Sequence, residues 1–411
     1  MFRLIRQFKD IEARIVASNI FWLSALQIAG YVFPLITMPY LAKVIGVTGF
    51  GKIAFASSIM VWIQTIADWG FNFTATRDVS KNRANIDSVS EIFSNVLWAR
   101  ILLSVVSFVF LIVLIILIPV FRDHSRIILV TFLMIPGHIF YPDWFFQAME
   151  RMKYITIINI ISKLFFTLCV FIFIKDENDY IIQPLLISIG YIISGIIAFL
   201  IILRWGIKIK APSLKNIIST IYNSFDVFIN NLMPNLYNSF STILLGCFTG
   251  SVGTGLLDAG SKFVNICQSF ISVLSRAFFP FLSRKLESHN LYLKINLSTS
   301  IILSLFLFVF SKFLITSFFT SDFDNAIVLM RILAISIPFL ALNNVYGTNY
   351  MIITGHEKEL RNITAIVSFL GFISAWPLIY FYGPIGAALN ITITRMLLGI
   401  FITYKAKSLT I

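Results

Sequence analysis

The sequence predicts an all-α polytopic membrane protein with about twelve transmembrane helices, arranged as two parallel-repeat six-helix lobes around a central cleft. Three observations predict this fold class. The chain is 58% hydrophobic and only 12% charged. Its apolar runs are long and continuous, without the alternation that a β-barrel requires. The two halves of the chain also carry a common glycine motif.

A helix of about 20 apolar residues crosses the hydrocarbon core of a bilayer. Applied along the chain, this length predicts spans near residues 18–42, 52–71, 95–121, 127–147, 155–174, 181–203, 222–249, 256–281, 295–319, 327–353, 362–381 and 386–404. The first run is long enough to be a full span and lacks the short apolar core of a signal peptide. We therefore expect it to be the first transmembrane helix.

The Lys and Arg residues of the loops predict the orientation of the chain. The two ends and every second loop hold twenty of them, and the other six loops hold five. Cytoplasmic segments carry this excess, so both termini are expected in the cytoplasm of a bacterial inner-membrane protein. The bias explains much of the net charge of +13 and leaves no basic face that would indicate a nucleic-acid partner.

The repeat is visible in two turns. Residues 46–51 read GVTGFG and residues 250–255 read GSVGTG, at an offset of 204, which is half the chain. Six predicted spans separate the two turns, so the halves have the same orientation and form a parallel repeat. This predicts an N-terminal lobe over 1–205, a basic cytoplasmic linker over 206–215 and a C-terminal lobe over 216–411. The glycines are expected to allow tight turns and close helix approach.

The same turn comes close to a nucleotide motif. Residues 46–53 read G-x-x-x-x-G-K-I, and Ile53 stands where a P-loop needs a Ser or Thr to hold magnesium. The four His residues show no metal-ligand spacing, and no nucleophile and base are arranged for covalent catalysis. We expect no nucleotide, no metal, no cofactor and no catalytic residue. Transport is then downhill or ion-coupled, with proton coupling as a hypothesis.

Seven cations interrupt the predicted spans: Arg100, Lys163, Lys262, Arg276, Lys312, Arg331 and Arg395. A cation at a membrane centre costs roughly 3 kcal/mol, so such residues face water, a partner or a substrate. Lys163 and Arg395 lie near the middle of their spans, where a lumen position is favoured. The other five lie nearer the ends, where snorkelling to the surface is an equal alternative. A cationic interior predicts an anionic substrate.

Polar residues also recur at helical spacing. Along the eighth span they follow steps of 4, 3, 4, 3 and 4: Asp258, Lys262, Asn265, Ser269, Ser272 and Arg276. Along the seventh they are Asn231, Asn235, Asn238 and Thr242. We interpret both stripes as facing substrate and water, with hydrogen bonding between helices as the alternative. Carboxamides and hydroxyls are suited to sugars.

These patterns give two sets of candidate residues. The substrate-binding candidates are Lys163, Lys262, Arg276, Arg331, Arg395, Asn231, Asn235, Asn238 and Asn265. The candidates for ion coupling or charge balance are Asp68, Asp143, Asp226 and Asp258. For Asp258, four residues before Lys262, simple pairing is the favoured role.

Four segments resemble one known family: residues 67–83 (ADWGFNFTATRDVSKNR), 142–160 (PDWFFQAMERMKYITIINI), 39–51 and 277–286. They are similar to the polysaccharide-export branch of the multidrug/oligosaccharidyl-lipid/polysaccharide (MOP) superfamily, specifically the Wzx O-antigen flippases. The resemblance implies a two-lobed flippase that moves an undecaprenyl-pyrophosphate-linked oligosaccharide from the cytoplasmic to the periplasmic leaflet. It also implies contact with membrane lipid and with other polysaccharide assembly proteins.

Two alternatives stay open at this point. A drug or small-solute exporter of the same superfamily would share the fold, although the excess of intramembrane cations over acids has the wrong sign for a cationic drug. A membrane polymerase or ligase of the same pathway would share the substrate. The predicted outer loops are too short to hold a catalytic domain, which argues against an enzyme.

Overall fold

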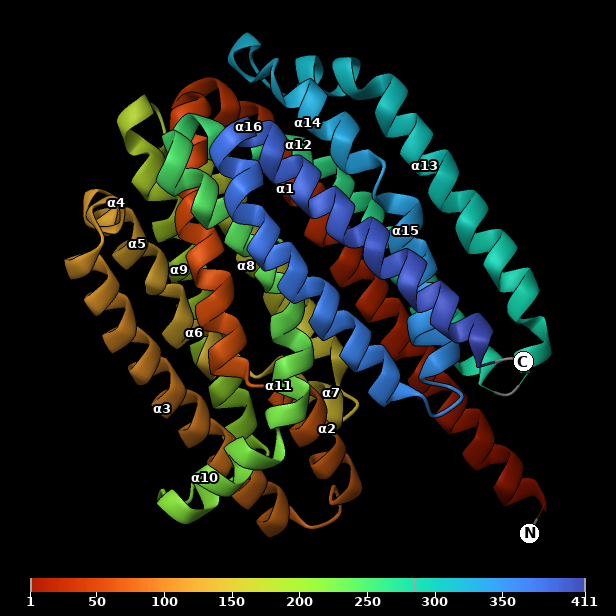
Figure 1. The fold of residues 1–411 in the computed structure, drawn as a ribbon. Coiled ribbons are helices and arrows are strands. Elements are labelled where there is room, and N and C mark those ends of the chain that lie inside the picture. Colours follow the sequence, from red (N-terminus) through yellow and green to blue (C-terminus); the bar gives the residue numbers. More distant parts are fainter. Residues whose placement is uncertain (1, 284, 410–411) are drawn as a thin grey trace. The chain divides into compact units, whose positions relative to one another are not determined.

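A computed structural model describes residues 2–283 and 285–409, and within these ranges the chain is helical without a strand (Figure 1). This confirms the all-α class. The α-helices are α1 Phe2–Asp68, α2 Phe71–Lys81, α3 Ile86–Leu117, α4 Pro119–Asp123, α5 Ser125–Phe132, α6 Met134–Phe140, α7 Asp143–Ala148, α8 Met152–Phe173, α9 Ile182–Arg204, α10 Leu214–Asn223, α11 Phe225–Leu232, α12 Ser239–Leu282, α13 His289–Phe318, α14 Ala326–Ala334, α15 Ile337–Leu342 and α16 Glu357–Ser408. Four 3₁₀-helices, η1 Glu177–Ile181, η2 Met233–Leu236, η3 Leu286–Ser288 and η4 Ser321–Phe323, and a π-helix, η5 Asn343–Met351, complete the secondary structure of these residues.

The number of membrane-spanning helices agrees with the expected twelve. In the described part of the chain, nine helical segments are long and apolar enough to cross a membrane. Three of them contain two helices that meet at a glycine with positive φ, at Gly46 in α1, Gly250 in α12 and Gly383 in α16. Nine segments plus three additional helices give twelve. Figure 1 shows α16 running out and back as a hairpin.

Contacts divide the chain into two compact units. The first comprises Met1–Tyr40 and Met60–Asn231, and the second comprises Leu41–Ile59 and Leu232–Ile411. In the first unit α6 and α8 both pack against α9, α2 packs against α7, and α10 packs against α3. In the second unit α12 packs against α13, α14 and α16.

The basic linker is fixed along α3 of the first unit. The backbone N–H groups of Lys208 and Lys210 donate hydrogen bonds to the hydroxyls of Ser90 and Ser94, over 3.1 Å and 2.9 Å. The Lys210 ammonium also lies 3.3 Å from Glu91. These bonds give the extended backbone the partners that it would otherwise need from water.

Two glycines bring α6 and α9 unusually close. A Cβ on Gly137 would lie 2.5 Å from the backbone nitrogen of Ile192, and one on Gly195 would lie 2.6 Å from the Gly137 carbonyl oxygen. Small residues allow this approach between membrane helices. The crossing places His138 of α6 beside Tyr191 of α9, with 5.9 Å between their ring centroids.

The repeated glycine turns have the same backbone conformation. Gly46 has φ 60° and ψ −175°, and Gly250 has φ 69° and ψ −165°. Only glycine adopts such torsions readily. Gly51 and Gly255, which follow at matching positions, approach other backbone atoms too closely for any side chain. The expectation of tight turns and close approach is confirmed.

Two predicted spans are not continuous helices. Residues 127–147 are divided among α5, α6 and α7, and residues 327–353 among α14, α15 and η5. In both, a new helix begins just before Pro136 or Pro338. Proline lacks the N–H that an uninterrupted helix needs, but fits the first turn of a new one. The break in each half falls at the corresponding Ile-Pro pair.

Candidate functional site

Asp68 is the last residue of α1, and the turn that follows is built from left-handed residues. Trp69 has φ 44° and Gly70 has φ 80°. A Cβ on Gly70 would lie 2.7 Å from the Val227 side chain, so this position requires glycine. The Trp69 ring stacks on Phe228 at 3.8 Å between centroids. The packed turn holds the Asp68 carboxylate against α3 and α6.

Asp68 joins a partly buried cluster of charged groups in the first unit. The Arg100 guanidinium, only 2% exposed, donates to Asp68 at 2.6 Å and to the Ile139 carbonyl at 3.1 Å. The His138 Nε2 lies 3.1 Å from both Asp68 oxygens. Asp68 therefore forms an ion pair with Arg100, and its role in ion coupling or charge balance stays a prediction. The snorkelling alternative for Arg100 is wrong, because its ion pair lies inside the unit.

A second carboxylate, that of Asp143, lies near His138. Asp143 is at the first position of α7, and the charges of His138, Asp68 and Arg100 act on its carboxyl group. Asp68 thus contacts both the permanent cation and the histidine, and Asp143 lies near them.

Lys163, at the middle of α8, lines a mostly apolar cavity of about 210 Å³ in the first unit. We call this cavity the Lys163 pocket; its polar lining residues are Tyr141, Asn159, Ser162, Lys163, Tyr191 and Ser194. Its ammonium group lies against α1, 3.4 Å from where a Cβ of Gly30 would be. No hydrogen bond or ion pair of this ammonium is found among the described residues. A cation beside hydroxyl and carboxamide groups, without a protein counter-ion, is suited to an anion.

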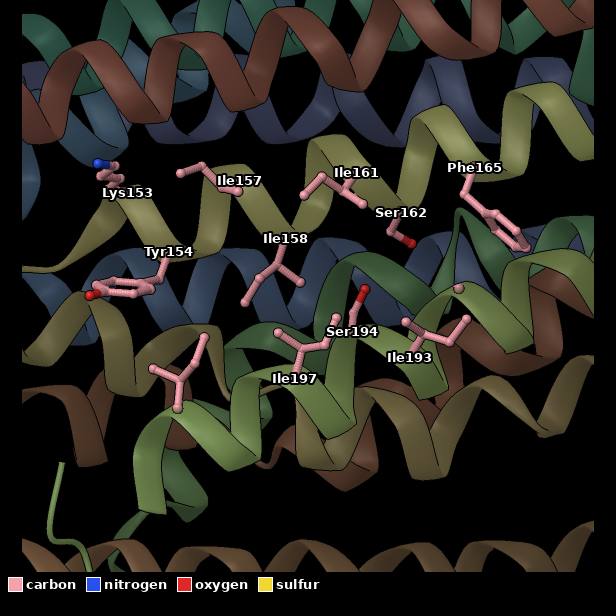
Figure 2. A pocket seen from close by; sticks show the side chains of 12 residues that line it. Lys153, Tyr154, Ile157, Ile158, Ile161, Ser162, Phe165, Ile193, Ser194 and Ile197 are labelled. Carbon is pink, nitrogen blue, oxygen red and sulfur yellow. The ribbon is translucent and has the colours of Figure 1, made fainter. Parts of the chain in front are cut away.

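An apolar groove lies along the adjoining faces of α8 and α9 (Figure 2). Its cavity is about 490 Å³, and we call it the isoleucine groove; its lining residues are Lys153, Tyr154, Ile157, Ile158, Ile161, Ser162, Phe165, Gly190, Ile193, Ser194, Ile197 and Ile201. Ser162, Gly190 and Ser194 line both this groove and the Lys163 pocket. The two cavities therefore adjoin at the seam between the helices.

Arg395 is a buried cation of the second unit. It is 6% exposed, and its guanidinium lies 3.2 Å from the Ser336 hydroxyl and 3.1 Å from the Asn238 carbonyl oxygen. Its Nε has no hydrogen-bond partner, and no carboxylate pairs with it among the described residues. Two of the predicted substrate-binding residues, Arg395 and Asn238, are thus brought together.

The polar stripe of the eighth span lies along α12. Asp258 and Lys262 form an ion pair of 2.9 Å, which confirms the pairing expected from their spacing. Asn265 and Arg276 are exposed on the surface of the second unit. The Arg276 Nε lies 3.4 Å from the Ser272 carbonyl of its own helix. The stripe therefore faces away from the core of this unit.

The polar stripe predicted for the seventh span is interrupted in the structure. The carboxamides expected along one seventh span do not share a regular helix, because α11 ends at Leu232 and α12 begins only at Ser239. The chain between them includes Pro234, which cannot continue the helical hydrogen bonding. Asn231 and Asp226 lie on α11, and Asn235 lies on η2.

Arg331, predicted to contact substrate, has partners within the second unit. Its Nε donates to the Ser311 hydroxyl at 2.8 Å, and its guanidinium lies 5.7 Å from the centroid of the Phe308 ring. These contacts join α14 to α13. A packing role accounts for this residue without a substrate.

Sequence reasoning missed a buried network around Tyr292. Its hydroxyl accepts hydrogen bonds from Asn349 at 2.7 Å and from Asn296 at 2.8 Å. Asn349 also donates to the Ser275 hydroxyl at 2.9 Å. Asn349 lies on the π-helix η5, a distortion that is frequent at functional sites. The only signal in the sequence was the density of Asn and Tyr over 343–350.

The chain was compared with known proteins. Residues 16–286 match the family described as "Polysaccharide biosynthesis protein". A protein of Escherichia coli (strain K12) named "Putative O-antigen transporter" is 30% identical over 389 residues, which cover 92% of this chain and 94% of that protein. A Shigella dysenteriae protein of the same name is 24% identical, with 95% and 99% covered.

Solved structures show the same fold. The lipid II flippase MurJ in an inward closed conformation has a TM-score of 0.72 at 18% identity, with 94% of this chain and 87% of that chain covered. The MATE multidrug transporter DinF-BH in complex with R6G has a TM-score of 0.65 at 16% identity, with 96% and 95% covered.

Proposed function

Since the chain belongs to the polysaccharide biosynthesis protein family, within the MOP flippases, we propose that it translocates a lipid-linked oligosaccharide. The protein is a multi-pass bacterial membrane transporter. The proposed substrate is an undecaprenyl-pyrophosphate-linked repeat unit of O-antigen or a related surface polysaccharide. The proposed direction is from the cytoplasmic to the periplasmic leaflet of the inner membrane, with both termini in the cytoplasm.

The observation that carries this proposal is the unpaired Lys163 in a pocket that also holds hydroxyl and carboxamide groups, beside an apolar groove. In a medium of low dielectric constant, a lysine attracts a pyrophosphate far more strongly than it does in water. Nearby hydroxyls and carboxamides supply donors and acceptors for sugars. The polyprenyl tail of the proposed substrate is apolar and requires no polar partner. Arg395 with Asn238 offers a similar combination in the second unit.

We further propose that the Asp68 cluster couples transport to protons. Protonation of His138, Asp68 or Asp143 would change the net charge of the cluster by one. Because these groups lie close together and away from bulk water, such a charge change favours a rearrangement of the side chains around them. In this proposal the charge change biases the first unit between two conformations, and no ATP site is required.

Deletion of the gene in its host tests the function. We expect loss of surface polysaccharide and accumulation of lipid-linked repeat units in the cytoplasmic leaflet, both reversed by a plasmid copy. A polymerase or ligase would instead leave these units in the periplasmic leaflet. A drug exporter would leave polysaccharide unchanged and raise sensitivity to its drugs. Either of those results would overturn the proposal.

A further inference from the structure

The isoleucine groove has a charged end and an apolar end. Figure 2 shows Lys153 and Tyr154 at one end, Phe165 at the other, and isoleucines of both helices between them. Residues 153 and 165 are twelve positions apart, so the groove extends about 18 Å along α8. Ile158 and Ser194 are 5% exposed and lie at its floor, whereas Ile161 and Ile197 are 58% and 40% exposed.

Two cations without carboxylate partners lie at the charged end. The Lys153 ammonium is 5.8 Å from the centroid of the Trp22 ring, and the Arg151 guanidinium is 4.3 Å from the Trp205 ring. No ion pair of either residue occurs among the described residues. Tyr154 contacts Trp205 at 5.3 Å between centroids. Aromatic rings and cations together are typical of the membrane interface.

We propose that this groove loads the lipid part of the substrate from the cytoplasmic leaflet, with a segment of the polyprenyl chain along the isoleucines and the pyrophosphate at Lys153. The inference rests on the proposed function and on the orientation that the Lys/Arg bias predicts, which puts the Lys153 end at the cytoplasmic surface. The apolar end then points toward the bilayer centre, as the tail of a lipid in that leaflet does.

Charge and shape favour a polyprenyl pyrophosphate over an ordinary phospholipid. A pyrophosphate carries more negative charge than the single phosphodiester of a phospholipid, so two unpaired cations attract it more strongly. Isoleucine side chains are stiff at χ1. They form a fixed apolar surface that a methyl-branched chain can occupy with little loss of protein entropy.

The seam beside the groove provides a route for the head group. Gly190 and Ser162 line both cavities, and a Cβ on Gly190 would lie 2.8 Å from the Ser162 hydroxyl. Small side chains therefore separate the groove from the Lys163 pocket. Moving from Lys153 to Lys163, the pyrophosphate would exchange one cation for another while its tail stays in the groove.

The test is photolabelling of the full-length protein in nanodiscs of phosphatidylethanolamine and phosphatidylglycerol. The probe is undecaprenyl pyrophosphate with a diazirine on an isoprene unit near the head group, and adducts are located by mass spectrometry. We expect adducts within residues 153–165 and 193–201. Excess unlabelled undecaprenyl pyrophosphate should remove them, and excess phosphatidylglycerol should not.

A matched pair of variants makes the test specific. Ile197→Trp fills the groove, whereas Ile196→Trp alters the next position of α9, which is 54% exposed and does not line the groove. Labelling should fall about tenfold in Ile197→Trp, which corresponds to about 1.4 kcal/mol of binding free energy, and be unchanged in Ile196→Trp. Lys153→Gln should weaken labelling and Lys153→Arg should retain it. If Ile197→Trp does not fold, Ile193→Trp repeats the test on the same wall.

Three results would overturn the inference: adducts on other helices, equal labelling of Ile197→Trp and Ile196→Trp, or equal competition by phosphatidylglycerol, which would identify an ordinary lipid site. The labelling reports the position of the prenyl chain alone. It can therefore fail while the deletion experiment confirms a flippase, and the two failures are distinguishable.

Discussion

Gly51 lies against Ser251, so closely that a Cβ on Gly51 would be 1.5 Å from the Ser251 carbonyl oxygen. Gly255 meets Val47 in the same manner, at 2.3 Å from its carbonyl oxygen. Both pairs of equivalent positions are related by the offset of 204, so the contact is reciprocal, like an isologous interface between two identical subunits. The Thr254 hydroxyl also donates to the Gly51 carbonyl at 3.0 Å.

This contact predicts that Gly51→Ala strongly destabilises the protein. The obstructing atom belongs to the backbone and cannot move aside as a flexible side chain can. We expect a loss above the roughly 1–3 kcal/mol that is typical of an overpacked site. Thermal unfolding in detergent measures it. Gly30→Ala is the control, since its nearest neighbour is the flexible Lys163 ammonium at 3.4 Å, and a normal transition in both variants would contradict the packing described.

Asp68→Asn is expected to lower the amount of folded protein. Removing this carboxylate leaves the Arg100 guanidinium buried without its ion pair, at a cost of about 3–5 kcal/mol. The double variant Asp68→Asn/Arg100→Gln should regain part of the loss, because it removes the unpaired charge. Quantitative blotting of membranes in a double-mutant cycle tests this. Additive losses would show that the two residues do not act as a pair.

Much of the fold could be predicted because its signals are local. Apolar length determines the spans, and the spacing of four residues determines the Asp258–Lys262 pair. The Asp68 cluster was missed in part because its members come from three helices, with 32 residues between Asp68 and Arg100 and 70 between Asp68 and His138. Their meeting depends on the packing of α3 against α6, which no local pattern indicates. The helix break at Pro234 could have been predicted from the sequence. A proline interrupts helical hydrogen bonding even where the polar residues of the predicted seventh span recur at helical spacing.

Asn238→Asp should inhibit transport without unfolding the protein. The new carboxylate would stand where the carbonyl oxygen now lies 3.1 Å from Arg395, and would neutralise the cation available to the substrate. We expect reduced surface polysaccharide at a normal protein level. Asn362→Asp makes the same change at an exposed position that is not a substrate-binding candidate, and should have little effect. Equal polysaccharide in both variants would remove Arg395 from the proposed site.

The proposed orientation predicts which single cysteines react from outside the cell. In a variant without the three native cysteines, Glu177→Cys and Asp322→Cys should react with an impermeant thiol reagent. Lys81→Cys and Lys208→Cys should react only after the membrane is opened. All four positions are exposed, so access to the reagent depends on sidedness rather than on burial. The opposite pattern would reverse the proposed topology and the direction of transport.

The most direct measurement follows lipid-linked sugar across a membrane. Purified protein is reconstituted into vesicles with a fluorescent oligosaccharide on undecaprenyl pyrophosphate, and an impermeant quencher reports the fraction in the outer leaflet. Wild-type protein should transfer the lipid between leaflets. Lys163→Gln should slow transfer about tenfold, equivalent to about 1.4 kcal/mol, and Lys163→Arg should be milder because the charge is kept. Transfer no faster than in protein-free vesicles, or an undiminished rate in Lys163→Gln, would contradict the proposed mechanism.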